Sequence, residues 1–529
     1  MMERLQTKKG KITMKRMIAL AGLGTLTAFG GVYNVKLDTS ADRVRSPLKV
    51  DLERVGTIRP RGVGEIHGSN WRLGCEILDR DYMNFDEYKE HVAPLGIKTV
   101  RLQGGWAKCE REKGKYDFAW LDHIVDYLKS QGVEAAIETS YGNPIYAGGG
   151  SVDLAAGFPT SEEGLAGWDA WVDAITRHFR GRVRTWLMWN EPDIRPKDGS
   201  AMKTPEQIAA FNVRTAKIVL RNIPDAKIAG LSLAHCKSEY FEECLKAMGE
   251  DAKLFDTFIY HGYAPAPESS YAEVEKHKAV LAKYAPNARM WQGENGCPSE
   301  MRPRFALAHI AWSEYSQAKW DMRRMLGDLG HDVFSSVYTI CDFLHAGAKG
   351  GQQNGMNNKG LIRANEERRV IAIKRAYYAV QNVVSVFDDT VVRVPDASFE
   401  KGFGAEDKSI ATYQYAKDGK PIFVFWSHGR DFQKIGGESG VLGEGKWRIP
   451  FERPGDSFET RPAVFKFTGG APLKEPVWVD LFTGRVYAFP KKDQLVAGDS
   501  VRFVNVPVYD SPCLLTERSA LDDRAVWLK

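Results

Sequence analysis

The sequence has no regular cysteine framework. Its 529 residues include seven cysteines, an odd number without a repeated spacing, at positions 75, 109, 236, 244, 297, 341 and 513. Disulfide scaffolds and structural zinc sites both need cysteines at recurring short intervals. We therefore exclude these two classes and expect most of the cysteines to be small, buried apolar residues, which leaves room for one or two isolated disulfides.

The chain also lacks net charge outside its N-terminus. Its formal net charge is +5, and residues 1–33 contain six basic residues against one acidic residue, so the remainder sums to zero. A nucleic-acid-binding domain needs a basic surface to neutralise phosphates. We therefore expect no nucleic-acid partner.

Long apolar runs are missing too, apart from residues 17–32, MIALAGLGTLTAFGGV. Basic residues precede this run and small residues end it, which is typical of a secretory signal peptide, whereas a membrane span needs roughly 20 apolar residues. We predict that residues 1–33 are a signal peptide, that the protein is exported to the periplasm or beyond, and that the mature chain has no membrane span. A buried helix or an uncleaved anchor is the alternative.

Strand-like and helix-like segments alternate through the middle of the chain. The strand-like segments are short, apolar or β-branched, and each ends at Gly, Pro, Asn or Asp. They are residues 65–77, 97–103, 133–142, 183–191, 226–234, 256–263, 288–294 and 335–343. Amphipathic runs follow them at 84–94, 116–132, 163–179, 204–224, 238–249, 271–286, 304–330 and 368–387.

Eight strands that are each followed by a helix predict an α/β fold, a (β/α)8 TIM barrel over residues 61–389. An open doubly wound sheet is the alternative, but the sequence has no Gly-rich phosphate loop after an early strand. From about residue 390, alternating apolar and polar residues with hairpin turns at Asp418-Gly419 and Thr483-Gly484 predict a C-terminal antiparallel β-sandwich over 390–529. Residues 34–60 are expected to add strands to it.

Two strand ends in the predicted barrel carry carboxylates. Catalytic groups of such barrels lie at the C-terminal ends of the strands, where the fourth strand runs into TWLMWNEPDI with Asn190 and Glu191, and the seventh ends in MWQGENG with Glu294. Two carboxylates that face each other across the barrel axis suit cleavage of a glycosidic bond. At a separation of about 5–5.5 Å the chemistry is retaining: one attacks the anomeric carbon, and the other protonates the leaving oxygen and later activates water.

Other strand ends supply supporting groups. Arg101 on the second strand and Tyr263 on the sixth are expected to keep the nucleophile ionised, while the acid needs a raised pKa. Asn190 is placed to hydrogen-bond a sugar 2-hydroxyl. The remaining candidates for binding or supporting the substrate are His261, Trp106, Asn143 and Asp342, with Glu76 a weaker one and Glu138 interpreted as structural.

The sequence resembles clan A glycoside hydrolases in four motifs at strand ends. These are WNEP on the fourth strand, Glu on the seventh, Arg on the second and HGY on the sixth. The family 39 β-xylosidases are resembled most in the stretch RLQGGWAKCEREKGKYDFAWLDHIVDYLKSQG and in ETSYGNPIY, which follows it. Their accessory sandwich is resembled in the C-terminal segments VWVDLFTGRVY and VPVYDSPCLL. The resemblance covers residues 34–520. The resemblance implies that Glu191 is the acid/base and Glu294 the nucleophile. One departure is that Glu294 follows Gly293, whereas the nucleophile of those enzymes usually follows Thr.

These observations predict an exported retaining glycoside hydrolase that acts on β-linked sugars, in an exo manner, with an oligosaccharide or glycoside as its partner. We expect no metal and no organic cofactor, because the two carboxylates supply the chemistry. An endo-acting clan A glycanase, a transglycosidase and a non-catalytic carbohydrate-binding protein are the alternatives. A uronic-acid substrate would need a basic residue in the pocket, for which Lys349, Lys359 and Arg363 are candidates.

Overall fold

The computed structural model describes residues 35–152, 157–195, 201–235, 237–301, 306–308, 310–345, 355–395, 399–402, 409–428, 456–468 and 471–529. The predicted signal peptide, residues 1–33, lies outside the described residues. No described helix has the length and apolar character that crossing a bilayer requires.

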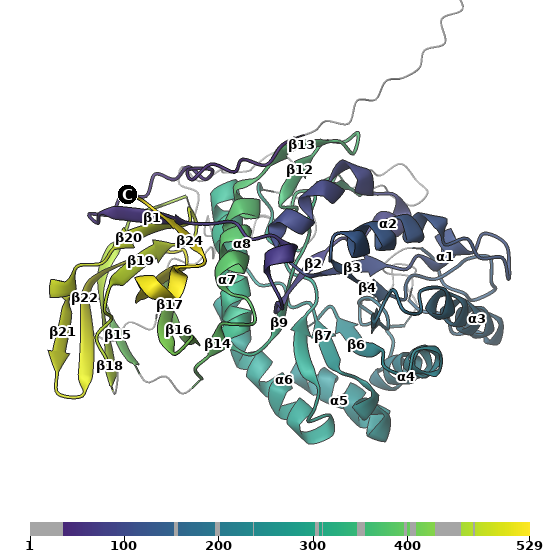
Figure 1. Ribbon diagram of the computed structural model, residues 1–529. Coiled ribbons are helices and arrows are strands. Elements are labelled where there is room, and N and C mark those ends of the chain that lie inside the picture. Colours follow the sequence, from purple (N-terminus) through teal and green to yellow (C-terminus); the bar gives the residue numbers. More distant parts are fainter. Residues whose placement is uncertain are drawn as a thin grey trace, which may run out of the picture. The chain divides into compact units, whose positions relative to one another are not determined.

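Eight parallel strands close into a barrel (Figure 1). They are β2 (Trp71–Gly74), β3 (Thr99–Gln103), β4 (Glu134–Glu138), β5 (Thr185–Leu187), β6 (Lys227–Leu233), β7 (Thr257–Tyr260), β8 (Arg289–Gln292) and β9 (Phe334–Val337). Strand β2 pairs with both β3 and β9, which closes the ring. The predicted (β/α)8 barrel is confirmed, with each strand shorter than its apolar segment in the sequence.

Helices α2 to α8 alternate with these strands where the amphipathic runs predict them, and the short α1 precedes α2 between β3 and β4 outside any predicted run. The helices are α1 (Trp106–Cys109), α2 (Ala119–Ser130), α3 (Glu162–His178), α4 (Pro205–Asn222), α5 (Ser238–Met248), α6 (Tyr271–Tyr284), α7 (Glu314–Gly330) and α8 (Arg375–Val386). Helix α4 begins with a capping box, in which Thr204 Oγ1 accepts from Gln207 N–H and Gln207 Oε1 accepts from Thr204 N–H.

The amphipathic run at 84–94 differs from its prediction. Instead of an α-helix it forms three short 3-10 turns, Phe85–Glu87, Lys89–His91 and Ala93–Leu95. Pro94 offers no N–H for an α-helical bond, and its ring would clash with the carbonyl four residues earlier. The segment still buries its apolar side against the barrel, since Phe85, Val92 and Leu95 are all buried.

The C-terminal region is built from two antiparallel sheets. The larger sheet has the order β14 (Val392–Arg393), β16 (Ile410–Lys417), β17 (Lys420–Ser427), β23 (Cys513–Glu517), β19 (Pro476–Asp480), β20 (Arg485–Ala488), β1 (Arg54–Ile58) and β24 (Ala525–Trp527). The smaller has β15 (Phe399–Gly402), β18 (Arg461–Thr468), β22 (Ser500–Val508) and β21 (Gln494–Ala497). Two short two-stranded sheets, β10 (Phe343–Leu344) with β11 (Met356–Asn357) and β12 (Ile362–Ala364) with β13 (Val370–Ile373), follow the last barrel strand.

Aromatic side chains join the two sheets of this sandwich. The rings of Phe423 and Phe467 lie 3.9 Å apart, and those of Phe425 and Phe465 lie 4.8 Å apart. Within the larger sheet, β1 from the N-terminal side of the barrel pairs with β20 and β24. Residues 35–53, which also read as strand-like, contain no strand.

Helix α7 lies between the barrel and the sandwich and is buried along nearly its whole length (Figure 1). Its polar residues bond to both sides. Arg323 forms a bidentate ion pair with Glu268 at 2.8 and 2.6 Å, and Trp426 of the sandwich donates its indole N–H to the same carboxylate at 2.6 Å. Lys319 Nζ donates to Asp510 of the sandwich at 2.6 Å. These ion pairs and hydrogen bonds around helix α7 therefore hold the sandwich against the barrel.

We predict that Glu268→Gln lowers the free energy of unfolding by about 3–5 kcal/mol, because it leaves the buried Arg323 guanidinium without its counter-charge. Burial would raise the pKa of Glu268, but Arg323 lowers it to about 2, so the carboxylate is ionised at neutral pH. Thermal or urea unfolding measures the loss. The matched control is Glu250→Gln on the exposed Lys253 pair, expected within about 0.5 kcal/mol of the parent. Equal stability of the two variants would contradict the prediction.

Candidate active site

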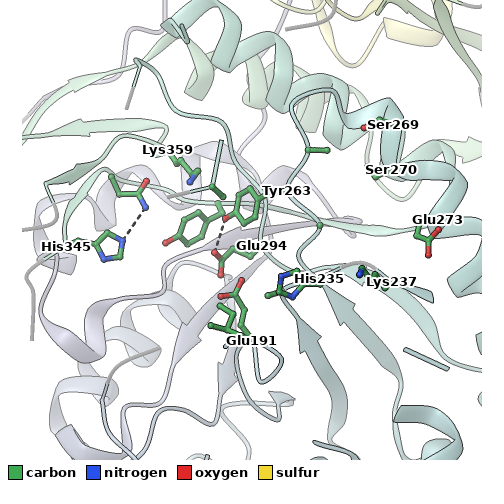
Figure 2. Close-up of a pocket in the computed structure, with 17 residues that line it drawn as sticks. Glu191, His235, Lys237, Tyr263, Ser269, Ser270, Glu273, Glu294, His345 and Lys359 are labelled. Atoms are coloured by element: carbon green, nitrogen blue, oxygen red, sulfur yellow. Dashed lines mark hydrogen bonds between the residues drawn. The ribbon is translucent and has the colours of Figure 1, made fainter. Parts of the chain in front are cut away.

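A cavity of about 710 Å³ opens at the C-terminal ends of the barrel strands. Figure 2 shows Glu191 and Glu294 at its centre, with their carboxyl groups directed toward each other. Residues after β6, β7 and β9 supply most of the remaining lining. The lining includes Glu191, Glu294, Tyr263, Tyr338, His235, His345, Asn357 and Lys359.

The chain turns sharply at Glu191, where φ is +47° in the left-handed region. Its N–H donates to Ser232 O at 2.9 Å. Ser232 belongs to an irregular part of β6, in which Leu231 and Ser232 also have positive φ values of 71° and 44°. Such residues cost roughly 1–2 kcal/mol each and persist where the surroundings enforce them, often at functional sites. This local geometry explains why an apolar strand ends so abruptly in Asn-Glu-Pro.

Asp193, two residues further on, ties this turn to the next loop. Its carboxylate accepts from Ala234 N–H at 2.7 Å and from His235 N–H at 3.0 Å. Asp193 is almost fully buried, so its charge acts on Glu191 with little screening by water.

Glu191 is the carboxyl group suited to hold a proton. Burial raises its pKa to about 7, and the charge of Asp193 adds to this rise while Arg101 opposes it. His261 Nδ1 lies 2.8 Å from Glu191 Oε1, and burial lowers the pKa of His261 to about 4, so this imidazole is neutral at neutral pH. A hydrogen bond to a neutral partner leaves Glu191 free to hold or lose its proton near pH 7.

Glu294 has the opposite environment, because donors face it. Tyr263 donates its hydroxyl to Glu294 Oε1 at 2.9 Å, and Arg101 Nη1 lies 3.5 Å from Oε2. Burial raises the pKa of Tyr263 well above its usual value, so the phenol stays a donor. Hydrogen bonds and a nearby cation favour an ionised carboxylate. Two carboxyl groups in contrasting environments are typical of an acid paired with a nucleophile.

The two carboxyl groups are close together. One oxygen of Glu191, one oxygen of Glu294 and one nitrogen of His261 all lie within 4.8 Å of one another. Three such groups could in principle ligate a metal ion. Within the protein, Glu191 Oε1 lies 2.8 Å from His261 Nδ1, and Glu294 Oε1 accepts from the Tyr263 hydroxyl at 2.9 Å.

Arg101 organises the floor of the site from β3. It is fully buried and bonds to Glu138, to Asn190 Oδ1 at 2.5 Å and to Gly293 O at 3.1 Å. A side chain at position 293 would overlap Ile259, so glycine lets the end of β8 pack this closely. Asn190 also donates to the Tyr141 hydroxyl at 2.8 Å, so its amide is held beside Glu191.

The structure does not support sugar contacts for Trp106 and Asn143. Trp106 is fully buried, donates its indole N–H to Glu110 Oε2 at 2.6 Å and stacks on Tyr146. Asn143 is 1% exposed and donates to Glu110 O at 2.8 Å. Both hold the loops after β3 and β4 together, because their side chains point into the packing behind the strand ends rather than into the cavity.

Asp342, predicted as a substrate-binding or supporting residue, does not line the cavity either. Its Oδ1 accepts from Lys374 Nζ at 2.6 Å and from Gly360 N–H at 2.9 Å, and the residue is buried outside the cavity. It fixes the long connection after β9. The central part of that connection, residues 346–354 with Lys349, lies outside the described residues.

Several lining residues were not among the sequence candidates for the catalytic machinery, and Tyr338, His235 and Lys359 are examples. Tyr338 directly follows β9, a position that the strand-end rule would have selected. His235 and Lys359 come from loops, and Lys359 Nζ lies 5.0 Å from the Tyr263 ring centre. No periodic pattern in the sequence marks where such loop residues will lie.

Comparison with protein families gives a match over part of the barrel. The family model described as beta-galactosidase, glycosyl hydrolase family 42, matches residues 80–147. Beta-galactosidase BbgII of Bifidobacterium bifidum is 34% identical over 73 residues, which is 12% of this chain and 10% of that protein. Beta-galactosidase BgaA of Clostridium cellulovorans is 28% identical over 76 residues, or 14% and 12%. The chain thus spans about a tenth of the length of the curated relatives it matches.

Solved structures with a similar fold cover most of the chain. A family 39 glycoside hydrolase from Bacteroides cellulosilyticus WH2 has a TM-score of 0.56 at 15% identity, over 85% of this chain and 81% of that one. The family 39 enzyme of Xanthomonas axonopodis pv. citri has 0.53 at 17%, over 88% and 95%. A family 30 endoxylanase from Clostridium papyrosolvens C71 has 0.52 at 11%, over 87% and 97%. The predicted resemblance to clan A glycoside hydrolases, barrel and sandwich together, is confirmed at the level of the fold.

We predict that Arg101→Met lowers the free energy of unfolding by about 3–5 kcal/mol, since it leaves Glu138 buried without its cation. Urea unfolding followed by circular dichroism measures the effect. Glu294→Gln is the matched control, because it removes a charge from the same cluster but leaves the Arg101–Glu138 pair intact. A variant Arg101→Met as stable as Glu294→Gln would show that Arg101 is not the cation that holds this cluster.

Proposed function

We propose that this protein is a retaining glycoside hydrolase that cleaves β-glycosidic bonds by double displacement. The observation that carries the proposal is the placement of Glu191 and Glu294, with carboxylate oxygens within 4.8 Å at the ends of β5 and β8, in contrasting environments. Retaining enzymes hold their two carboxyl groups about 5–5.5 Å apart, and inverting enzymes hold them about 6.5–9.5 Å apart.

In the first displacement, Glu294 attacks the anomeric carbon and forms a covalent glycosyl ester. Glu191 donates its proton to the departing glycosidic oxygen, for which a pKa of about 7 is well matched near neutral pH. In the second, Glu191 removes a proton from water, which attacks the ester and restores Glu294. Tyr263 and Arg101 bond to Glu294 and orient its attacking oxygen.

We further propose exo action on β-linked sugars, in the manner of the β-xylosidases whose fold this chain shares. Support comes from the connection after β9, which brings His345, Asn357 and Lys359 into the cavity wall (Figure 2). Of the basic residues considered for a uronic acid, Lys359 lines the cavity, whereas Arg363 pairs with Glu314 at 2.9 Å. A glucuronide therefore belongs in the substrate panel. Export, inferred from residues 1–33, remains a prediction.

The site assignment predicts a defined response to azide. Glu294→Ala and Glu191→Ala should each lower kcat/KM, by on the order of 10⁴-fold or more for the nucleophile and about 10²–10⁴-fold for the acid. Azide should restore turnover in both, with an α-glycosyl azide from Glu294→Ala and a β-glycosyl azide from Glu191→Ala, because each displacement inverts the anomeric carbon.

The assay uses aryl α- and β-glycosides of xylose, glucose, galactose, arabinose and glucuronic acid, with azide products identified by NMR. Activity that survives both substitutions would overturn the assignment. A folded wild type that is inactive on every aryl glycoside but cleaves inside polysaccharides would contradict exo action. Sugar-to-sugar transfer in place of hydrolysis would identify a transglycosidase.

The raised pKa of Glu191 predicts a pH effect that depends on the leaving group. The acid is protonated below its pKa and loses its proton as the pH rises through about 7, so kcat/KM for a phenyl glycoside should fall above pH 7. A dinitrophenyl glycoside needs no acid and should show no fall there. Asp193→Asn removes a charge that raises this pKa, so the fall should begin at a lower pH. Identical profiles for the two leaving groups would contradict the role of Glu191.

A further inference from the structure

A third carboxyl group, Glu76, lies beside the catalytic pair and has no part in the mechanism above. It follows β2 by two residues and is only 2% exposed. Any side chain at Gly74 would overlap Glu76 Oε2, so glycine at that position makes room for the carboxyl group. The fold therefore accommodates a buried acid at this strand end.

One guanidinium nitrogen is shared between this carboxyl group and the nucleophile. Arg101 Nη1 lies 3.2 Å from Glu76 Oε1 and 3.5 Å from Glu294 Oε2. The same guanidinium also bonds to Glu138 through Nη2. One cation thus faces two buried carboxyl groups, Glu76 and Glu138, and the partly buried Glu294. If all three were ionised, one cation would oppose three anions with little water to screen their repulsion, which is strongly unfavourable.

Hydrogen bonds decide which of the three keeps its proton. Glu138 accepts from Arg101 and from Ser140 Oγ at 3.0 Å, and Glu294 accepts from Tyr263 at 2.9 Å. Neither oxygen of Glu76 forms a hydrogen bond with another of the described residues. The contact of Glu76 with Arg101 Nη1 at 3.2 Å is an ion pair that Glu294 shares, and a buried carboxylate that lacks hydrogen bonds of its own is the least stable of the three anions, so Glu76 is the group that stays protonated.

The pKa of Glu76 agrees with the conclusion that this carboxyl group stays protonated. Burial raises its pKa to about 8, Arg101 acts against the rise, and the charges of Glu294 and Glu138 add to it. The other titratable groups that feel Glu76 are Cys75, Tyr88 and Tyr338, and burial raises the pKa of each well above its usual value. They stay neutral over the working range, so Glu76 is the group here that responds to a change of charge on Glu294.

We propose, on the basis of the retaining mechanism above, that Glu76 is a positioning residue that carries a proton while Glu294 is ionised and releases it while Glu294 is esterified. When Glu294 bonds to the anomeric carbon, the bond to the leaving oxygen breaks and takes the electron pair, and Glu294 loses its negative charge. Glu76 is then the one carboxyl group beside Arg101 Nη1 that can carry a negative charge, so Glu76 ionises and its proton passes to water in the cavity.

The second displacement reverses the exchange. Water attacks the anomeric carbon, the ester bond breaks, Glu294 regains its charge, and Glu76 takes a proton back from solvent. The charge around Arg101 is therefore the same in the free enzyme and in the intermediate. Arg101 keeps its place beside the nucleophile through both steps because it exchanges one carboxylate partner for another.

The protonation of Glu76 in the free enzyme is tested by electrophoretic mobility. At pH 7, Glu76→Gln should migrate with the wild type, since a neutral group replaces a neutral group. At pH 9.5 the two should differ by one charge. Glu250→Gln, on a side chain that is 90% exposed, is the control and should differ from the wild type by one charge at both values. A one-charge difference for Glu76→Gln at pH 7 would overturn the proposal.

The exchange itself is tested by counting protons in a Glu191→Gln background, where the acid/base no longer contributes. The probes are 2,4-dinitrophenyl 2-deoxy-2-fluoro-β-xyloside, -glucoside and -galactoside, whose phenolate leaves without taking a proton. Mass spectrometry counts the adduct on Glu294, and an indicator dye counts protons at pH 7. We expect about one proton per adduct in Glu191→Gln and none when Glu76→Gln is added.

An adduct that forms without proton release in Glu191→Gln would overturn this inference and leave the proposed function intact. Failure of all three probes to form an adduct would count against the proposed function, while the mobility measurement would still decide whether Glu76 is protonated. The proton count in Glu191→Gln needs no change at Glu76, so the test stands even if Glu76→Gln does not fold.

Discussion

The site depends on a single buried cation. The Arg101 guanidinium is fully buried and reaches Glu138, Asn190, the carbonyl of Gly293 just after β8, and two further carboxyl groups. A charge taken out of water needs several partners of good geometry, and for Arg101 on β3 these come from β4 and from the ends of β2, β5 and β8. The barrel is what brings those strand ends within reach of one side chain, and the packing of the site follows from that constraint.

The position of Arg101 also gives two chemically identical residues, Glu191 and Glu294, different surroundings. Glu294 lies where Arg101 and the Tyr263 hydroxyl stabilise an anion, and Glu191 lies where burial, a neutral His261 and the charge of Asp193 favour the protonated acid. Their difference is a difference in hydration and in nearby charge. Two residues of one type thus have different proton affinities because the protein distributes its donors unevenly, which is the arrangement that the proposed mechanism requires.

Some features could be predicted from the sequence because they repeat along the chain, or because they lie at the C-terminal ends of barrel strands, where catalytic groups are found. The alternation of strands and helices is of this kind, and so is the location of Glu191 and Glu294 at strand ends. Trp106, Asn143 and Asp342 show the limit of that reasoning. Each is near a strand end, but whether a side chain enters the cavity or the packing behind it depends on partners such as Glu110 and Lys374, which are distant in sequence. Loop residues such as His235 and Lys359 follow no period at all.

By itself the sequence determined the fold class, because the period of apolar residues dictates which face of each element is buried, and it determined the identity of the two central carboxyl groups. Only the tertiary structure decided the surroundings of each carboxyl group. Protonation depends on the water removed from each group and on charges within a few ångströms. Arg101 lies within β3, while Asp193, Tyr263 and Glu76 follow three other strands, and their distances to Glu191 and Glu294 exist only once the barrel has closed.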